Sequence, residues 1–250
     1  MTRRDLDPAE HVRERSAAWD VLYAALALAA VVIASDVVGD LLLRSPGVPP
    51  LVSVVVSYLV IWVPLLAAVV FATLGLGRAG ALRRLGLRLR PLDVLWGVGI
   101  GLIARVLDAV VNLVVVGSTG LEPVPTIDGG PALGVLVATV LARVLLAPVV
   151  EEVFFRGLLQ RSTARLLSTP TRLDARGAAV MAVITTSLVF ALLHALVGSF
   201  SPAGLLVTLV STTIFGLLVG TLAARTGRIG GAVIAHVAFN GLAVAATWPV

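Results

Sequence analysis

The chain contains no cysteine and no lysine, and charged residues of any kind are scarce. The absence of cysteine excludes disulfides and thiolate metal sites. Only 13% of the 250 residues are charged, whereas soluble domains carry about 25%. A chain of this length could bury a core, but it has too little charge to cover that core with a surface that meets water. Most of the chain is therefore expected to face lipid.

All 19 basic residues are arginines, and the formal net charge is +5. A basic balance can indicate nucleic-acid binding, but these arginines stand in short clusters between long apolar runs. That distribution is typical of the cytoplasmic loops of a membrane protein. We therefore expect the lipid bilayer to be a partner and nucleic acid not to be one. A composition rich in Ala, Val, Leu, Gly and Arg further indicates a GC-rich, bacterial genome.

Seven apolar stretches are long enough to cross a bilayer, since a spanning helix needs roughly 17–25 apolar residues. They are continuously apolar rather than alternating, which favours helices over a barrel. We predict an all-α polytopic membrane protein with about seven transmembrane helices. The predicted spans are Ala18–Leu43, Leu51–Leu76, Leu92–Gly117, Pro131–Arg156 (continuing toward Leu167), Ala178–Val197, Pro202–Ala224 and Ile229–Trp248.

The arginines are unequally divided between the two sides of these spans. Because cytoplasmic loops are enriched in arginine, the side that carries most of them is predicted to be cytoplasmic, with the N-terminus inside and the C-terminus outside. The expected location is the bacterial inner (plasma) membrane. One side holds Arg3, Arg4, Arg13, Arg15, Arg78, Arg83, Arg84, Arg88, Arg90, Arg161, Arg165, Arg172, Arg176, Arg225 and Arg228, and the other holds only Arg44.

The pattern divides the chain into three parts. Residues 1–17 form a predicted cytoplasmic tail, residues 18–130 the first three spans, and residues 131–250 the last four. Since further membrane spans follow the first one, we interpret it as a retained anchor rather than a cleaved signal peptide. The basic segment Leu76–Pro91 is expected to lie along the cytoplasmic interface or to form a solvated loop.

Several charged residues lie inside the predicted spans, where charge is costly and marks a candidate functional site. Asp40 and Arg44 are four residues apart and can pair, as can Arg105 and Asp108, so a structural role is favoured for both pairs. Arg143 has no local partner, and we expect it to reach an aspartate on a neighbouring helix or to extend toward the interface. The spacings Gly97–Gly101 and Gly216–Gly220 indicate close helix packing.

Two adjacent glutamates inside the fourth span are hard to explain by stability alone. Glu152 and Arg156 share a helix face and can neutralise each other. Glu151 points about 100° away and keeps no local partner. Pro148 cannot donate a hydrogen bond to the carbonyl of Val144, so we expect a kink just before the pair. The alternative is that both glutamates only anchor arginines of neighbouring helices.

Two of the three histidines, His194 and His236, lie deep in apolar spans. His236 and Asn240 are four residues apart and therefore share one face of the last span. A single buried histidine is more often a hydrogen-bonded structural residue. Two histidines, an asparagine in register and the unpaired Glu151 together favour a site for chemistry.

These residues form three motifs, Glu-Glu-x-x-x-Arg, Phe-x-x-x-His and His-x-x-x-Asn, in this order on three separate spans. The set resembles the CPBP family, which comprises CAAX prenyl endopeptidases of the second type and related bacteriocin-processing or immunity proteins. The resemblance covers Pro131–Trp248, about half of the chain. The matching residues are Glu151, Glu152, Arg156, Phe190, His194, His236 and Asn240.

The resemblance implies a CAAX-protease-like helical bundle and an intramembrane endopeptidase whose site opens toward the cytoplasm. Glu151 would be the general base that activates water, assisted by His194. His236 and Asn240 would stabilise the oxyanion. Three further residues would support the site: Glu152, Arg156 and Phe190. The substrate would be a membrane-associated peptide or protein.

The chemistry agrees, because amide hydrolysis needs a base for water and donors for the developing oxyanion. The main rival mechanism uses a metal. Glu151, His194 and His236 could hold a divalent cation such as zinc and leave a position open for water. However, the chain has no His-Glu-x-x-His helix, and Asn240 is a poor zinc ligand but a good donor. A glutamate mechanism without a cofactor is therefore favoured.

The depth of the two histidines imposes a condition on the fold. At about 1.5 Å per residue, His236 lies about 12 Å above Arg228, whereas His194 lies about 27 Å above Arg176. Both helices start from the same side. The motifs can meet only if the fifth span extends into the cytoplasm or tilts strongly, so the fourth and fifth helices are predicted to protrude there.

Two other classes of function stay open on the sequence alone. A non-catalytic, immunity-type membrane protein could keep the fold without hydrolysis, although retention of all three motifs argues against this. A small proton-coupled transporter could also carry intramembrane Glu and His. Carriers often show inverted repeats and paired broken helices, and the sequence contains neither pattern.

Overall fold

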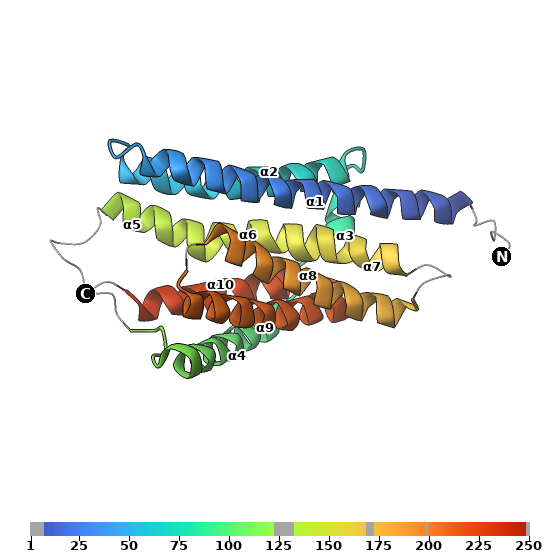
Figure 1. The fold of residues 1–250 in the computed structure, drawn as a ribbon. Coiled ribbons are helices and arrows are strands. Elements are labelled where there is room, and N and C mark those ends of the chain that lie inside the picture. The colour runs from blue at the N-terminus through green and yellow to red at the C-terminus, as the bar shows by residue number, and fades with distance from the viewer. Residues whose placement is uncertain (1–7, 123–132, 169–172, 199, 249–250) are drawn as a thin grey trace.

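The computed structural model describes residues 8–122, 133–168, 173–198 and 200–248, except for the side chains of residues 8–15. Every regular element in this part of the chain is helical (Figure 1). The elements are α1 (Pro8–Leu43), α2 (Pro50–Thr73), α3 (Arg78–Leu85), α4 (Pro91–Val116), α5 (Leu133–Val140), η1 (Leu141–Leu146), α6 (Ala147–Glu152), η2 (Val153–Leu159), α7 (Gln160–Leu167), α8 (Ala175–Val197), α9 (Pro202–Thr226) and α10 (Gly230–Ala246).

Within the described residues, six helices are long and apolar enough to cross a membrane. They are α1 from Ser16 onward, α2, α4, the continuous helix formed by α5 to α7, α8 and α9. A seventh apolar helix, α10, has 17 residues and is shorter than the other six. The predicted all-α polytopic membrane fold is confirmed, with six long helices and one short helix where seven similar spans were expected.

The helix boundaries mostly follow the prediction. The fourth span does continue to Leu167, whereas α1 already begins at Pro8, within the predicted tail. The predicted start of the fourth span, Pro131, lies outside the described residues. The same is true of Arg3, Arg4 and Arg172.

The helix formed by α5 to α7 contains two π-helical turns, η1 and η2, one on each side of the glutamate pair. Across η1 the N–H of Ala147 donates to the carbonyl of Ala142, and across η2 the N–H of Gln160 donates to that of Phe155. Pro148 follows η1 almost directly. A π-helical turn, a feature often found at functional sites, therefore lies where the sequence predicted a kink.

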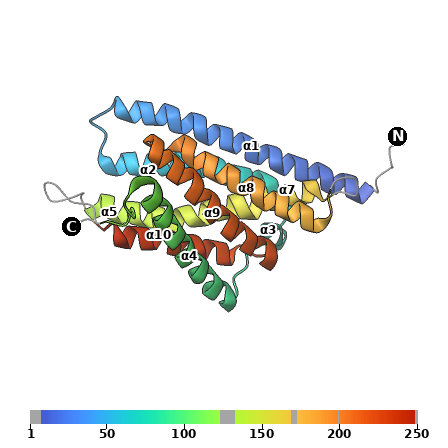
Figure 2. The ribbon, with the colours of Figure 1, turned by 60° about the horizontal axis from the view of Figure 1, so that its bottom comes forward.

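This long helix runs through the middle of the bundle, as Figures 1 and 2 show. The helices α1 and α2 lie on one side of it, and α4, α9 and α10 lie on the other (Figure 1). The segment α6 contacts both α2 and α10. Glu151 and Glu152 are thereby placed in the interior, where three distant parts of the sequence can meet.

Small residues allow the helices around the long one to approach closely. A Cβ atom added at Gly97 would lie 2.7 Å from the carbonyl oxygen of Gly231, and one at Gly101 would lie 2.7 Å from that of Ala235. A Cβ atom at Gly216 would lie 2.9 Å from the nearest atom of α8. The prediction of close packing at both glycine pairs is confirmed, and α10 is fixed against α4.

Ion pairs attach the arginine-rich connections to the bundle. Asp20 of α1 accepts hydrogen bonds from Arg84 of α3 and from Arg165 of α7. Asp93, at the start of α4, lies 2.6 Å from Arg228 in the turn between α9 and α10. The hydrogen bond to this carboxylate raises the pKa of Arg228 above its ordinary value. These contacts gather the connections after α2 and α9 and the last turn of α7 at one end of the bundle, called the arginine-rich end below.

The basic segment Leu76–Pro91 is a packed part of this end. Its central part forms the short helix α3, and Leu85 is buried. Arg84 adds the ion pair to α1. The segment is therefore held by the bundle rather than forming a solvated loop.

The helices are staggered along the bundle axis. At the arginine-rich end, α1, α7 and the start of α8 extend beyond the ends of α9 and α10 in both views (Figures 1 and 2). His194 lies near the end of α8, and His236 lies near the start of α10. The stagger brings both histidines to the level of Glu151, as the difference in depth required.

Candidate active site

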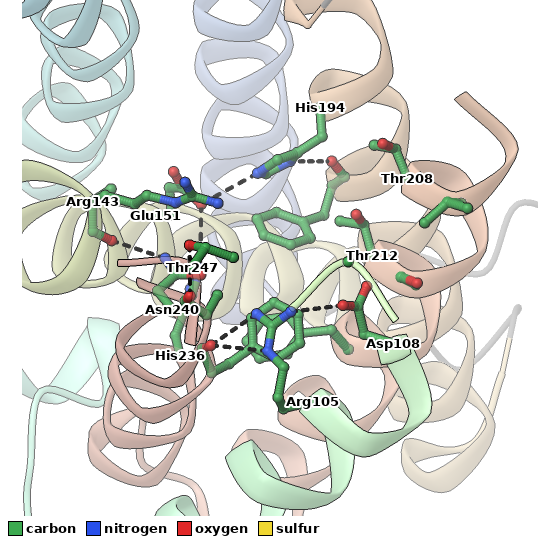
Figure 3. Close-up of a pocket in the computed structure, with 18 of the residues that line it drawn as sticks. Arg105, Asp108, Arg143, Glu151, His194, Thr208, Thr212, His236, Asn240 and Thr247 are labelled. Atoms are coloured by element: carbon green, nitrogen blue, oxygen red, sulfur yellow. Dashed lines mark hydrogen bonds and ion pairs between the residues drawn. The ribbon is translucent and has the colours of Figure 1, made fainter. Parts of the chain in front are cut away.

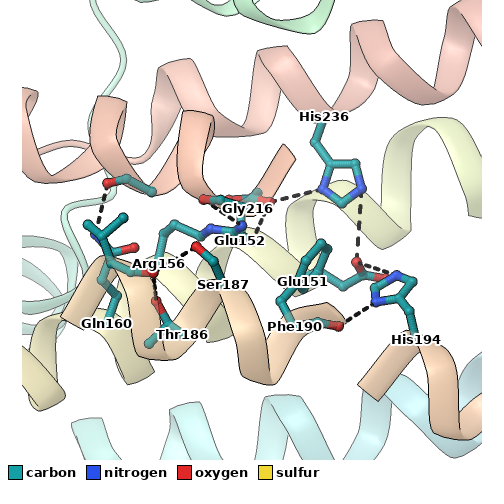
Figure 4. A network of polar contacts seen from close by, with 12 residues as sticks. Glu151, Glu152, Arg156, Gln160, Thr186, Ser187, Phe190, His194, Gly216 and His236 are labelled. Carbon is teal, nitrogen blue, oxygen red and sulfur yellow. Dashed lines mark hydrogen bonds and ion pairs between the residues drawn. The ribbon is translucent and has the colours of Figure 1, made fainter. Parts of the chain in front are cut away.

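Glu151 of α6, His194 of α8 and His236 of α10 converge in the interior of the bundle (Figure 4). The Nε2 atom of His194 lies 3.8 Å from Oε2 of Glu151, and the Nε2 atom of His236 lies 3.9 Å from the same oxygen. These distances are too long for direct hydrogen bonds. The Oε2 atom is buried and finds no hydrogen-bond partner among the described residues. The carboxylate of Glu151 and the two imidazole rings therefore face one another without direct hydrogen bonds between them.

The hydrogen bond at the Nδ1 atom of each histidine determines the tautomer of its ring. The Nδ1 atom of His194 lies 2.9 Å from the carbonyl oxygen of Phe190, which can only accept, so Nδ1 carries a hydrogen. The Nδ1 atom of His236 donates in the same way to Oε1 of Glu152, at 2.9 Å. In the neutral form of each ring, the lone pair of Nε2 is then directed toward Glu151.

The second glutamate forms a buried ion pair behind this point. Arg156 donates from Nη1 to Oε1 of Glu152 at 3.0 Å, and both side chains are fully buried. The same oxygen accepts from His236, so Glu152 joins the long helix to α10. The predicted pairing of Glu152 with Arg156 is confirmed. Since neither charge meets water, each depends on the other.

Phe190 supports the site through ring contacts. Its ring centroid lies 4.4 Å from that of His194 and 4.8 Å from that of Phe155. The guanidinium of Arg156 lies 4.6 Å from the centre of the Phe190 ring, in a cation–π arrangement. Phe190, from the second motif, thus contacts both His194 of the same motif and Arg156 of the first motif.

Asn240 lies one helical turn beyond His236 on the same face of α10. It donates from Nδ2 to the main-chain carbonyl of Arg143 in η1, at 2.8 Å. This bond uses one of its two amide hydrogens. Asn240 therefore ties α10 to the π-helical turn and lines the same cavity as Glu151 and both histidines.

Three other charged residues of the predicted spans, Arg105, Asp108 and Arg143, line the same cavity. Arg105 pairs with Asp108 at 2.6 Å, as predicted, and also donates to the carbonyl of Phe239. The predicted pair of Asp40 and Arg44 is confirmed too, but it is exposed and remote from the site. Arg143 is exposed and forms no ion pair with any residue that the structure describes, so its expected aspartate partner is not found there.

The cavity has a volume of about 740 Å³ and lies in front of Glu151 (Figure 3). The sequence interpretation missed much of its wall. Thr208, Ser211 and Thr212 face it from α9, and Tyr58 lines it from α2. The Oγ atom of Ser211 is buried and unpaired among the described side chains. The spacing of the three hydroxyl residues, at helical positions i, i+3 and i+4, was the available signal.

The arrangement can be tested as a metal site. Among the residues that the structure describes, no group of three or more His, Asp or Glu side chains has the spacing of a metal centre. The acceptor atoms of Glu151, His194 and His236 nevertheless face one another. Such a set can share a water molecule that donates its hydrogens, or it can close around a cation. The donor set is chemically compatible with both.

Fold and site together define an all-α polytopic membrane protein with an acidic and imidazole cluster at the base of an internal cavity. Residues 133–242 match the family model described as type II CAAX prenyl endopeptidase Rce1-like. The resemblance to the CPBP family is thereby confirmed for this part of the chain, which carries all three motifs. Comparison with curated proteins and with solved structures gave no match.

Proposed function

We propose that this protein is an intramembrane endopeptidase that hydrolyses a peptide bond with a water molecule activated by Glu151 and His194. One observation carries the proposal. The buried, unpaired Oε2 of Glu151 faces the Nε2 atoms of His194 and His236 at 3.8 and 3.9 Å, at the base of a cavity. A water molecule placed there can donate one hydrogen to Glu151 and the other to His194, as the mechanism requires.

In this mechanism Glu151 is the general base. It takes a proton from water while the water oxygen forms a bond to the peptide carbonyl carbon. The carbon–nitrogen bond then breaks, and the proton held by Glu151 returns to the leaving amine. His194 holds the water through Nε2, because its Nδ1 is engaged by the carbonyl of Phe190.

His236 and Asn240 supply the donors for the oxyanion. When His236 carries a second proton, its Nε2–H can donate to the carbonyl oxygen while its Nδ1–H stays bonded to Glu152. Asn240 offers the amide hydrogen that Arg143 does not use. Donors of this kind act because they are fixed before the charge develops. Glu152 and Arg156 position His236 and do not touch the substrate.

The metal alternative uses the same side chains. Glu151, His194 and His236 would hold a divalent cation such as zinc, which would supply Lewis-acid activation of water. The two possibilities differ in their response to chelation. Under the favoured glutamate mechanism, cleavage by the purified protein in lipid vesicles persists after treatment with a zinc chelator. Loss of cleavage that added zinc restores would support the metal alternative.

The test compares membranes from cells that produce the protein or its Glu151→Gln variant, with new peptide termini identified by mass spectrometry. Glu151→Gln keeps the size and burial of the side chain but removes the base. We expect the termini formed by the protein to disappear, since loss of a general base costs about 10²–10⁴ in rate. Asp40→Asn, at the exposed pair with Arg44, is the matched control and should retain them.

An unchanged set of termini in the Glu151→Gln membranes, with both proteins present at equal levels, would contradict the proposal. It would favour a non-catalytic membrane role that keeps the fold. Substrate-dependent flux in proteoliposomes without any cleavage would favour a transporter instead.

A further inference from the structure

A second pocket, with a volume of about 330 Å³, lies at the arginine-rich end of the bundle. Arginines and a glutamine of the long central helix form one wall, and alanines of α8 and α9 form the opposite wall. None of the described residues that line this pocket also lines the cavity in front of Glu151. It is therefore a separate feature, called the basic pocket below.

The basic pocket exists because large side chains face small ones across it. Gln160, Arg161 and Arg165 lie on one side of α7, since positions four and five residues apart share a helix face. Ala182 and Ala223 stand opposite them. Methyl side chains do not fill the space in front of the arginines, so a ligand can enter there.

Arg165 shares its counter-charge with another arginine. Asp20 accepts hydrogen bonds from both Arg165 and Arg84, so one carboxylate faces two guanidinium groups. The Nη2 atom of Arg165 makes the bond to Asp20 and a second one to Ser162. Its Nε and Nη1 atoms have no hydrogen-bond partner among the described residues, and they can donate to a ligand.

Arg161 forms no ion pair with any residue that the structure describes. Its Nη2 atom donates to the main-chain carbonyl of Gly227, a contact that balances no charge. Arg161 and Arg165 are four residues apart on one helix, where like charges repel each other. The basic pocket therefore holds more positive charge than its carboxylates balance, and a bound anion would offset the excess.

Gln160 adds a requirement of a different kind. Its Nε2 atom donates to the carbonyl of Gly220 at 2.9 Å, which fixes the orientation of the amide. The Oε1 atom is buried and finds no hydrogen-bond partner in the described part of the chain. Figure 4 shows Gln160 beside Arg156, at the inner end of the pocket. Because an unpaired buried acceptor costs free energy, a fitting ligand carries a hydrogen-bond donor as well as an anionic group.

An exposed apolar stripe runs along α8 from the level of the basic pocket. Ala179 lines the pocket. The next residue, Val180, is exposed, and Ile184, Leu188 and Leu192 follow it at intervals of four. Residues at this spacing share one side of a helix. A ligand with its charged end in the pocket and an acyl chain on this stripe would contact both surfaces.

We propose that the basic pocket binds the phosphate group of an anionic phospholipid whose headgroup also carries a hydroxyl, as in phosphatidylglycerol. Arg161 and Arg165 donate to the phosphate oxygens, and Oε1 of Gln160 accepts from the hydroxyl. Guanidinium groups match phosphate in charge and geometry, and basic pockets between membrane helices bind lipid headgroups. Binding does not depend on catalysis by Glu151. A phosphate ester in solution carries the same charged group, so the test separates the two sources.

The test counts the lipids that the purified protein retains in detergent, by native mass spectrometry, after incubation with phosphatidylglycerol or phosphatidylcholine. Arg161→Gln removes the arginine that has no ion pair. Arg83→Gln is the matched control, because Arg83 is exposed on α3 at the same end and does not line the pocket. Ala224→Leu fills the pocket without a change of charge, at an exposed position where the fold should tolerate a larger side chain.

We expect the unsubstituted protein to retain phosphatidylglycerol in preference to phosphatidylcholine. Arg161→Gln should weaken this binding by about 10–100-fold, as expected for the loss of hydrogen bonds to a charged group. Ala224→Leu should also weaken it, and Arg83→Gln should not. Equal losses for Arg161→Gln and Arg83→Gln would show attraction by surface charge alone and overturn the proposal, as would equal retention of the two lipids. If Arg161→Gln does not fold, Ala224→Leu and Arg83→Gln decide.

Glycerol phosphate distinguishes the two sources, because it has the phosphate and the hydroxyls but no acyl chain. We expect phosphatidylglycerol to raise the Tm of the protein in detergent, and glycerol phosphate at the same concentration to raise it much less. An equal rise with both compounds, lost in each case with Arg161→Gln, would assign the pocket to a soluble phosphate ester and overturn the lipid assignment.

Discussion

His236 donates from its Nδ1 atom to Oε1 of Glu152 at 2.9 Å, across a separation of 84 residues in the chain. This bond joins the short helix α10 to the long central helix. The oxygen that accepts it also accepts from Arg156. One carboxylate oxygen thus accepts from both an arginine and a histidine, and the next two predictions compare Glu152 with its neighbour Glu151.

Glu152→Gln should lower the stability of the protein substantially. The substitution leaves the fully buried Arg156 without a counter-charge, and breaking a buried pair in this way costs about 3–5 kcal/mol. We expect a clear drop in Tm in detergent or lipid vesicles, together with loss of cleavage. Asp40→Asn serves as the control, because its exposed pair with Arg44 is worth about 0–1 kcal/mol. Equal Tm values for the two variants would contradict the structural role of Glu152.

Glu151→Gln should abolish most of the activity with little effect on stability. The Oε2 atom of Glu151 has no hydrogen-bond partner among the described residues, so the amide removes no bond that the fold uses. Activity should fall by about 10²–10⁴-fold while the Tm stays close to that of the unsubstituted protein. A Tm loss as large as that of Glu152→Gln would show that Glu151 is structural.

Asn240→Ala should reduce kcat by about 10²–10³-fold with little change in KM, as expected for a lost oxyanion donor. Because Asn240 also bonds to the carbonyl of Arg143, the Tm is measured alongside. Asn112→Ala is the matched control, since among the described residues Asn112 donates within its own helix, to the carbonyl of Asp108. A change confined to Tm and KM would argue that Asn240 positions the helix without touching the transition state.

Gly101→Ala should destabilise the contact between α4 and α10. The added Cβ would lie 2.7 Å from the carbonyl oxygen of Ala235, and overpacking of this kind costs about 1–3 kcal/mol. Gly99→Ala on the same helix provides the comparison, because no described atom outside its own helix turn lies within 4 Å of its Cβ position. That change should be neutral or raise stability by up to about 1 kcal/mol. A similar Tm for the two variants would exclude tight packing here.

Local pairs in the site could be predicted from the sequence because helix geometry fixes them. Glu152 with Arg156, and Arg105 with Asp108, follow from spacings of four and three residues on one helix. The apolar runs predicted the helices for the same reason. The bond between His236 and Glu152 could not be predicted, since it depends on how far two helices rotate and slide against each other.

Other features depend on the same long-range arrangement. The partner of Asn240 is a main-chain carbonyl of η1, and no side-chain pattern indicates a main-chain acceptor. The sequence predicted a kink at Pro148, and it gave no indication of the π-helical turn that directly precedes this proline in the structure.

The two π-helical turns have a consequence for how this site can change. Each turn adds one residue to the helix, which rotates everything beyond it by about 100° relative to an uninterrupted α-helix. The glutamate pair lies between two such rotations, η1 before it and η2 after it. Insertion or deletion of one residue in either turn would therefore rotate Glu151 about the helix axis relative to the part of the helix beyond that turn. Its orientation relative to the other part of the helix would not change. The orientation of the glutamate pair can therefore change relative to either end of the central helix separately.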